Sequence, residues 1–220
     1  MNRLAKILIA STALATLPLS LASAADTTNA AQILNGQVNL HVAISNVNSE
    51  FMNVQGDVGA QSVAAGNVLD VTTMNDTYVT NEQYASTVNI SSSLSSNVKN
   101  VGGSVGLQSQ AVCNSASIST DPTTTQIYSN QECMAQDPSS TINSVAQNIG
   151  GDLSIASSAL GNSFAADSNA PNMPVETHQI NHSSTYSTVN ASAYNVNGSV
   201  GVSSAAIGNN AQVIHYSTDQ

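Results

Sequence analysis

Positive charge is almost absent from this chain. Only three of its 220 residues are Lys or Arg, against 13 Asp and Glu. Two of these cations, Arg3 and Lys6, stand at the amino terminus, so Lys99 is the only one in the rest of the chain. A nucleic-acid-binding surface needs several cations to neutralise phosphates, and docking on an anionic bilayer needs a basic cluster. The charge balance therefore argues against nucleic acid and against anionic membrane surfaces as partners.

Large aromatic side chains are also scarce. The chain has no Trp and only two Phe, Phe51 and Phe164, while Ser, Thr, Asn, Gln, Gly and Ala dominate the composition. Uncharged polar compositions of this kind occur in disordered chains and in extracellular fibrous proteins. The strict repeats described below favour the fibrous class, because disorder does not require a regular pattern.

Beyond the amino terminus, no apolar run is long enough for a membrane helix. Arg3 and Lys6 precede a mostly apolar stretch over residues 7–21, and Ala22-Ser23-Ala24 then forms an A-x-A cleavage signal. We therefore predict a signal peptide over residues 1–24 and a single mature domain over residues 25–220, with a formal charge of 1 − 13 = −12. An uncleaved anchor helix is the alternative. The protein is expected to be exported, without a transmembrane helix.

One fifteen-residue pattern occurs four times. The copies start at Asn53, Asn100, Asn148 and Asn195, so the offsets are 47, 48 and 47 residues. A fixed period of this size is typical of stacked repeat architectures, which work through extended surfaces or through their ends. We expect four repeats, at approximately residues 37–85, 86–139, 140–186 and 187–220.

Every second residue of the pattern is aliphatic or small. The second copy has Val101, Gly103, Val105, Leu107, Ser109 and Ala111 at these positions, with mostly polar residues between them. This period of two predicts a β-strand with one buried face. A second strand is expected before each copy, for example over residues 38–44, and the connecting segments are expected to be irregular loops. The pattern predicts an all-β fold, a β-solenoid of four stacked repeats with one large coil or two smaller coils each. An elongated β-sandwich of long hairpins is the alternative.

Each copy ends in Asn, preceded by Gly in three of the four copies. Gly and Asn tolerate positive φ, so we expect a corner after the strand at this point. The amides either stack into a side-chain ladder or act as ordinary turn residues. These repeat corners are Asn67, Asn114, Asn162 and Asn209.

The only two cysteines are Cys113 and Cys133. Export places them in an oxidising compartment, where an even count favours a disulfide over two free thiols. The bridge would close the segment 119–138 back onto the corner of the second repeat. A redox role is disfavoured because the chain has no C-x-x-C pair.

No catalytic arrangement stands out, and we predict neither an enzyme nor a cofactor or metal site. His178 and His182, with Glu176 nearby, lie in a Pro- and Asn-rich stretch and lack the H-E-x-x-H arrangement of zinc enzymes. Asp57 and Asp152 share a motif position two repeats apart, at about 10–20 Å, which is marginal for a pair of glycosidase carboxylates.

The ends of a coil stack carry unpaired backbone donors and acceptors. Charges and prolines usually block such edges, and few of either occur near the last predicted strand, Val213-Ile214-His215-Tyr216. We therefore expect the sheet edges to bind a second copy of this chain or other envelope anchor proteins.

The residues Ile33-Leu34-Asn35-Gly36-Gln37-Val38, followed by corners such as Ala64-Ala65-Gly66-Asn67 and Ala206-Ile207-Gly208-Asn209, resemble the holdfast attachment protein D family. The resemblance implies an outer-membrane-associated surface protein that helps to tether an adhesive polysaccharide to the cell envelope. It supplies no catalytic residues. A weaker resemblance to curlin-like amyloid fibre subunits, whose repeats are about half as long, is one alternative. A polysaccharide-active β-helix enzyme is the other.

Overall fold

The computed structural model describes residues 31–86, 89–121, 124–134 and 136–216; the predicted signal peptide lies outside these ranges. The described residues form twelve β-strands and no helix. The strands are β1 (Ala31–Asn39), β2 (Ala43–Val54), β3 (Val58–Thr73), β4 (Thr77–Ala85), β5 (Ile90–Val101), β6 (Val105–Thr120), β7 (Thr125–Cys133), β8 (Ser139–Ile149), β9 (Leu153–Ser168), β10 (Val175–Asn181), β11 (Tyr186–Val196) and β12 (Val200–His215).

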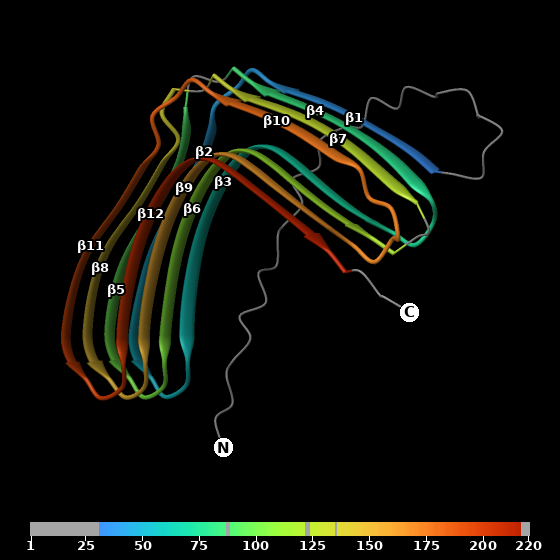
Figure 1. Ribbon diagram of the computed structural model, residues 1–220. Coiled ribbons are helices and arrows are strands. Elements are labelled where there is room, and N and C mark those ends of the chain that lie inside the picture. Colours follow the sequence, from blue (N-terminus) through green and yellow to red (C-terminus); the bar gives the residue numbers. More distant parts are fainter. Residues whose placement is uncertain (1–30, 87–88, 122–123, 135, 217–220) are drawn as a thin grey trace.

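The strands form three parallel sheets of four strands each. Sheet A has the order β1-β4-β7-β10, sheet B the order β11-β8-β5-β2, and sheet C the order β12-β9-β6-β3. Three consecutive strands, one from each sheet, make one coil, and the next coil lies directly beside it (Figure 1). The prediction of a β-solenoid is therefore confirmed, and each sequence period forms one large coil. Coils 1 to 4 span residues 31–73, 77–120, 125–168 and 175–215. Each coil begins several residues before the start of the repeat expected from sequence.

Equivalent residues of the four motif copies lie in register. Val58 pairs with Val105, Val105 with Leu153, and Leu153 with Val200. This column is the stacking that the alternating pattern predicts, with the aliphatic residues of neighbouring coils in contact inside the solenoid.

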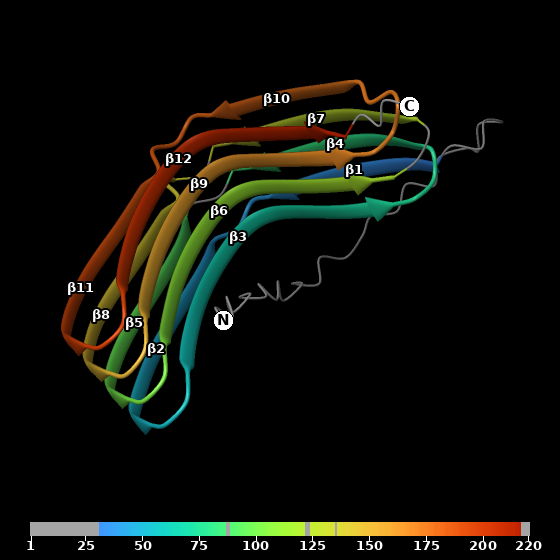
Figure 2. The same cartoon turned by 60° about the horizontal axis from the view of Figure 1, so that its bottom comes forward.

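Each coil is L-shaped, because the strands of sheet C bend in the middle (Figures 1 and 2). The first half of sheet C packs against sheet B, around Leu94, Val105 and Ile142. The second half packs against sheet A, around Ile118, Ile127 and Phe164. A small cluster that includes Ile90 and the two cysteines fills the elbow between these arms. Three small cores thus replace one large core, which explains how a chain so poor in aromatic residues can fold.

At the elbow the structure differs from one expectation drawn from the sequence. We expected a corner after the strand, with Gly and Asn at positive φ, but the Gly-Asn pairs lie inside 16-residue strands and no described Gly has positive φ. In β6 the four consecutive residues from Ala111 to Asn114 are buried, which marks the point where the inward-facing positions change from odd to even numbers. The positive φ angles occur instead at Asp137 and at the first residue of each motif copy: Asn53, Asn100, Asn148 and Asn195.

Two other expectations about strands were wrong. The strand expected over residues 38–44 is interrupted at residues 40–42, between β1 and β2. The segments expected to be loops contain β4, β7 and β10, and β7 lies in the supposed excursion 119–138. The inward residues of these strands are largely amides and hydroxyls, such as Asn81, Gln83 and Gln131, so their alternation carries no hydrophobic signal.

Candidate functional site

A ladder of Asn side chains follows the elbow through all four coils and is buried in the first three. Nδ2 of Asn67 donates to Oδ1 of Asn114, Asn114 donates to Asn162, and Asn162 donates to Asn209, at 2.8, 2.8 and 2.9 Å. Each Nδ2 also donates to a backbone carbonyl of sheet A; the acceptors are Tyr84, Glu132, Ile180 and Gln179. The four residues that the sequence marks as corners therefore tie the coils together and hold sheet C against sheet A.

A second ladder, of Gln side chains, also runs along the stack, and its amides donate in the opposite direction, toward coil 1. Nε2 of Gln179 donates to Oε1 of Gln131, Gln131 donates to Gln83, and Gln83 donates to Gln37, at 2.8, 2.7 and 3.1 Å. Each Nε2 also donates to a carbonyl of sheet C; the acceptors are Asn210, Ser163, Ser115 and Val68. The sequence analysis missed this ladder, although the recurrence of Gln at offsets of 46, 48 and 48 residues is a signal that could have revealed it.

A third ladder lies on the surface, at the turns between sheets B and C. Nδ2 of Asn100, Asn148 and Asn195 each donates to Oδ1 of the equivalent Asn in the preceding coil, at 2.9, 2.8 and 2.8 Å. These residues have φ between 54° and 58°, the left-handed region that Asn tolerates better than most residues. The ladder therefore supports both the turn and the contact between coils.

The two aspartates that the sequence offered as a glycosidase pair lie beside this turn in structural hydrogen bonds. Oδ1 of Asp57 accepts from the backbone N–H of Ser104 at 2.7 Å, and Oδ1 of Asp152 accepts from that of Ser199 at 2.8 Å. Between them, Oγ of Ser104 accepts from the backbone N–H of Asp152 at 3.2 Å. The row alternates Asp, Ser, Asp, Ser along the stack, so the carboxylates are separated by a whole coil.

Serine hydroxyls form a further chain inside the arm between sheets B and C. Consecutive Oγ atoms lie 2.8–3.0 Å apart from coil 1 to coil 3. Its members are Ser45, Ser62, Ser92, Ser109, Ser140 and Ser157. Because each hydroxyl finds a partner, these polar groups can be buried without the desolvation penalty of an unpaired group.

A disulfide joins Cys113 of β6 to Cys133 of β7, with their Cα atoms 6.0 Å apart. The bond lies in the elbow and links coil 2 to coil 3. In the other coils the position of Cys113 is held by Gly66, Gly161 and Gly208, and an Asn side chain of sheet A, Asn39 or Asn181, packs near that glycine.

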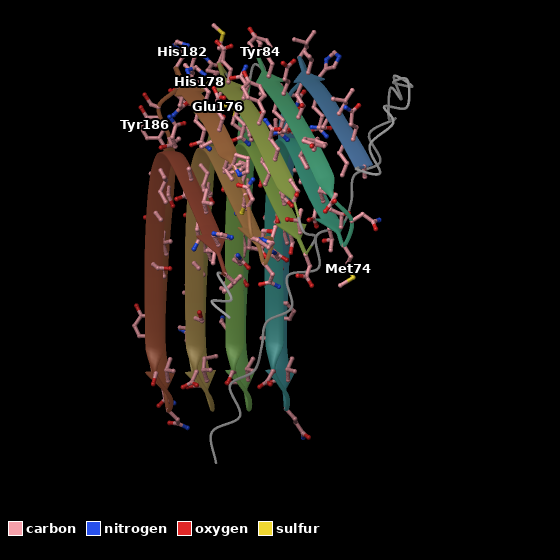
Figure 3. The ribbon with its side chains drawn as sticks, turned by 45° about the vertical axis from the view of Figure 1, so that its right-hand side comes forward. Met74, Tyr84, Glu176, His178, His182 and Tyr186 are labelled. Carbon is pink, nitrogen blue, oxygen red and sulfur yellow. A yellow bond between two sulfur atoms is a disulfide. The ribbon has the colours of Figure 1, made fainter. Side chains whose placement is uncertain are left out.

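The histidines do not assemble into a catalytic or metal-binding group. Figure 3 shows Glu176, His178 and His182 on the outside of the molecule, near Tyr84 and Tyr186. Nδ1 of His178 lies 3.3 Å from Oδ1 of Asn130, and Nε2 of His182 lies 3.6 Å from Oε1 of Glu132. Within the described ranges, no three His, Cys, Asp or Glu side chains lie close enough to hold a metal ion.

Among the residues that the structure describes, none covers either end of the stack. Val105 and Leu153 of the middle coils are only 2% and 1% exposed, whereas Val200 in the same column of coil 4 is 51% exposed. In coil 1 the inward residues Val47 and Phe51 are likewise only partly buried, although their equivalents in coil 2 are fully buried. The end coils thus present the same aliphatic columns and ladders as the interior, without a neighbouring coil.

A shallow open groove crosses sheet B. It is lined mostly by amide and hydroxyl side chains from all four coils; the exceptions are Glu50, Val145 and Ala191. The row Asn48, Ser95, Asn143 and Asn190 crosses it from coil to coil. Such groups both donate and accept hydrogen bonds and therefore suit hydroxyl-rich ligands.

These features define a protein class: a parallel β-solenoid with open ends, cross-linked by amide ladders and a disulfide. The family model described as holdfast attachment protein D matches residues 5–219, and the chain belongs to this family. The resemblance found in the sequence is thereby confirmed. No match was found among curated proteins or solved structures. The described residues contain no helix long and apolar enough to cross a membrane.

Proposed function

We propose that this protein is exported to the cell surface and helps to anchor an adhesive polysaccharide, the holdfast, to the outer envelope. Membership of the family supports a role in holdfast attachment. The predicted signal peptide and the uncharged polar composition support export and a surface location.

The observation that carries this proposal is the pair of uncovered ends. A linking protein must hold two partners at once, and a solenoid with an open edge at each end offers two separate binding surfaces. We expect these edges to bind envelope anchor proteins or further copies of the chain.

The body between the ends suits a load-bearing role. Three amide ladders and the disulfide connect the coils in addition to the backbone hydrogen bonds of the sheets. A force along the stack would therefore be shared among many bonds.

The polar groove on sheet B is the candidate surface for the polysaccharide. Its hydroxyl and amide groups are neutral hydrogen-bond donors and acceptors, which suit the hydroxyl groups of a sugar. Replacing Asn143 and Asn190 with Leu would remove donors and acceptors from the part of this surface formed by coils 3 and 4. Reduced binding of the purified polysaccharide is expected, with Ser117→Leu, an exposed position outside the groove, as the matched control.

Deleting the gene tests the anchoring role. The proposal predicts that cells still produce the polysaccharide but release it into the medium, and that gold labelling finds the protein at the adhesive site of intact cells. Retention of the polysaccharide on deleted cells would contradict the proposal. Release of reducing ends from acidic exopolysaccharides by the purified protein would instead favour the enzyme alternative.

The curlin-like alternative fits less well, because two half-length units per period would form two coils. The structure has one coil of three strands per period.

A further inference from the structure

We propose that copies of this chain stack head to tail, with coil 4 of one copy on coil 1 of the next, so that the solenoid continues as a polar filament. This inference deepens the proposed function, because it names one occupant of the open ends, a second copy of the chain, and fixes its orientation.

The direction of the elbow Asn ladder is the first argument. Each Nδ2 donates toward coil 4, so Asn67 at the coil 1 end has an Oδ1 that accepts no hydrogen bond in the described structure. At the coil 4 end, Nδ2 of Asn209 bonds only the carbonyl of Gln179, which leaves its second hydrogen for another acceptor. The donor at one end therefore matches the acceptor at the other.

The Gln ladder and the surface Asn ladder donate toward coil 1, and their ends are also complementary. At the coil 4 end, Gln179 and Asn195 present side-chain oxygens to which no described donor points. At the coil 1 end, Gln37 and Asn53 keep amide hydrogens for such acceptors. All three ladders are thus complementary across a contact between coil 4 and coil 1. Such a contact would bury the ends of the elbow Asn ladder between coils, as Asn114 and Asn162 are buried in the middle coils.

The row of aspartates and serines continues across the same contact. Along the chain the order is Asp57, Ser104, Asp152 and Ser199, with bonds between coils at each step. A following copy places its Asp57 beside Ser199, so the alternation is kept and no two carboxylates of this row become neighbours. Oγ of Ser199 can then accept from the backbone N–H of Asp57, as Oγ of Ser104 accepts from Asp152.

Apolar side chains are matched at the two ends as well. Extending the observed registers places Tyr186 on Ile44, and these residues are equally exposed at 54%. The same extension continues the column of Val200 with Val58. The edge strands also agree in length, with β10, β11 and β12 of 7, 11 and 16 residues facing β1, β2 and β3 of 9, 12 and 16.

A contact between two like ends lacks this complementarity. In the elbow Asn ladder, two fourth coils would present donors from both sides and two first coils would present acceptors from both sides. The Gln ladder and the surface Asn ladder would be mismatched in the reverse sense. A contact between unlike ends that does not close into a ring generates an open filament. With four coils per copy and about 4.8 Å between coils, the axial rise per copy is about 19 Å.

The test uses the exported chain with one Lys placed at either end. Val58→Lys puts a charge on the coil 1 end, and Val200→Lys puts one on the coil 4 end. Val200 is 51% exposed, and Val58 is partly exposed at the open edge of coil 1, so a Lys side chain at either position can extend to solvent in the monomer. Circular dichroism verifies that both variants fold. Ser117→Lys, on the exposed face of coil 2, is the matched control. Particle mass is measured by light scattering after size exclusion, and filaments are examined by electron microscopy.

Head-to-tail stacking predicts filaments for the wild-type chain and the control, and monomers for each end variant alone. An equal mixture of the two end variants should give a dimer and nothing larger, because it contains one intact pair of unlike ends. A monomeric wild type, a mixture that stays monomeric, or an end variant that dimerises by itself would each overturn the inference. The deletion experiment tests anchoring in cells and this experiment tests stacking in solution, so either proposal can fail alone.

Discussion

Replacing Asn114 with Leu should destabilise the protein strongly, although Leu has a similar size and is apolar. Asn114 is fully buried; it donates to Asn162 and to the carbonyl of Glu132, and it accepts from Asn67. The substitution removes a hydrogen-bond partner from three groups: Nδ2 of Asn67, Oδ1 of Asn162 and the carbonyl of Glu132. Each lost bond costs about 1–3 kcal/mol of unfolding free energy. Burial of the Leu side chain returns about 1.5–3 kcal/mol. With the middle of each range, the expected net loss is about 4 kcal/mol of unfolding free energy, a large part of the roughly 5–15 kcal/mol typical of a domain.

Asn143→Leu is the matched control. Asn143 accepts an equivalent hydrogen bond from Asn190 at 3.0 Å, but it is exposed on sheet B, so water can replace the lost bond. A change within about 0.5 kcal/mol is expected there. Guanidinium unfolding followed by circular dichroism gives the midpoint for each variant, in the Val200→Lys background to exclude assembly. If both midpoints shift equally, burial of the amide is not what makes the ladder stabilising.

The remaining predictions concern the disulfide, the elbow and the open edge. Cys113→Ser should lower the free energy of unfolding by about 2–4 kcal/mol. Adding reductant to the wild-type chain should shift its unfolding midpoint down to the value of this variant. Gly161→Ala should lower the melting temperature, because the added Cβ would overlap the carbonyl of the adjacent coil, whereas Gly106→Ala, with nothing within 4 Å, should leave it unchanged or raise it. Val213→Pro combined with Tyr216→Lys should abolish assembly without unfolding the monomer; persistent oligomers in size exclusion would exclude this edge as the assembly surface.

The stacking could be predicted because its signals are periodic. The four motif copies have a near-constant offset, and the aliphatic column from Val58 to Val200 alternates with polar residues, so both the β-structure and the register follow from spacing. The spacing also marked Asn67 and its equivalents as a related set. It did not determine whether their amides bond one another, because a turn Asn and a ladder Asn recur with the same period.

Sheet A could not be recognised from hydrophobic periodicity. Its inward positions hold Asn81, Gln83, Ser129 and Gln131, all fully or almost fully buried. Such residues usually indicate solvent exposure, and hydrogen bonds to equivalent residues of the neighbouring coils make their burial favourable here. The backbone conformation at the elbow differed from the expectation for a related reason: Gly-Asn usually indicates a turn, whereas here the bend occurs inside a continuous strand.

The most direct test of the account is the distance between nitroxide spin labels at Gln61 and Ser203, measured by electron paramagnetic resonance in the Val200→Lys background. These outward positions of sheet C are three coils apart in one column. Three steps of about 4.8 Å predict a backbone separation of about 14 Å. A separation beyond about 25 Å, as expected for hairpins laid end to end with strands of this length, would contradict the stacked solenoid.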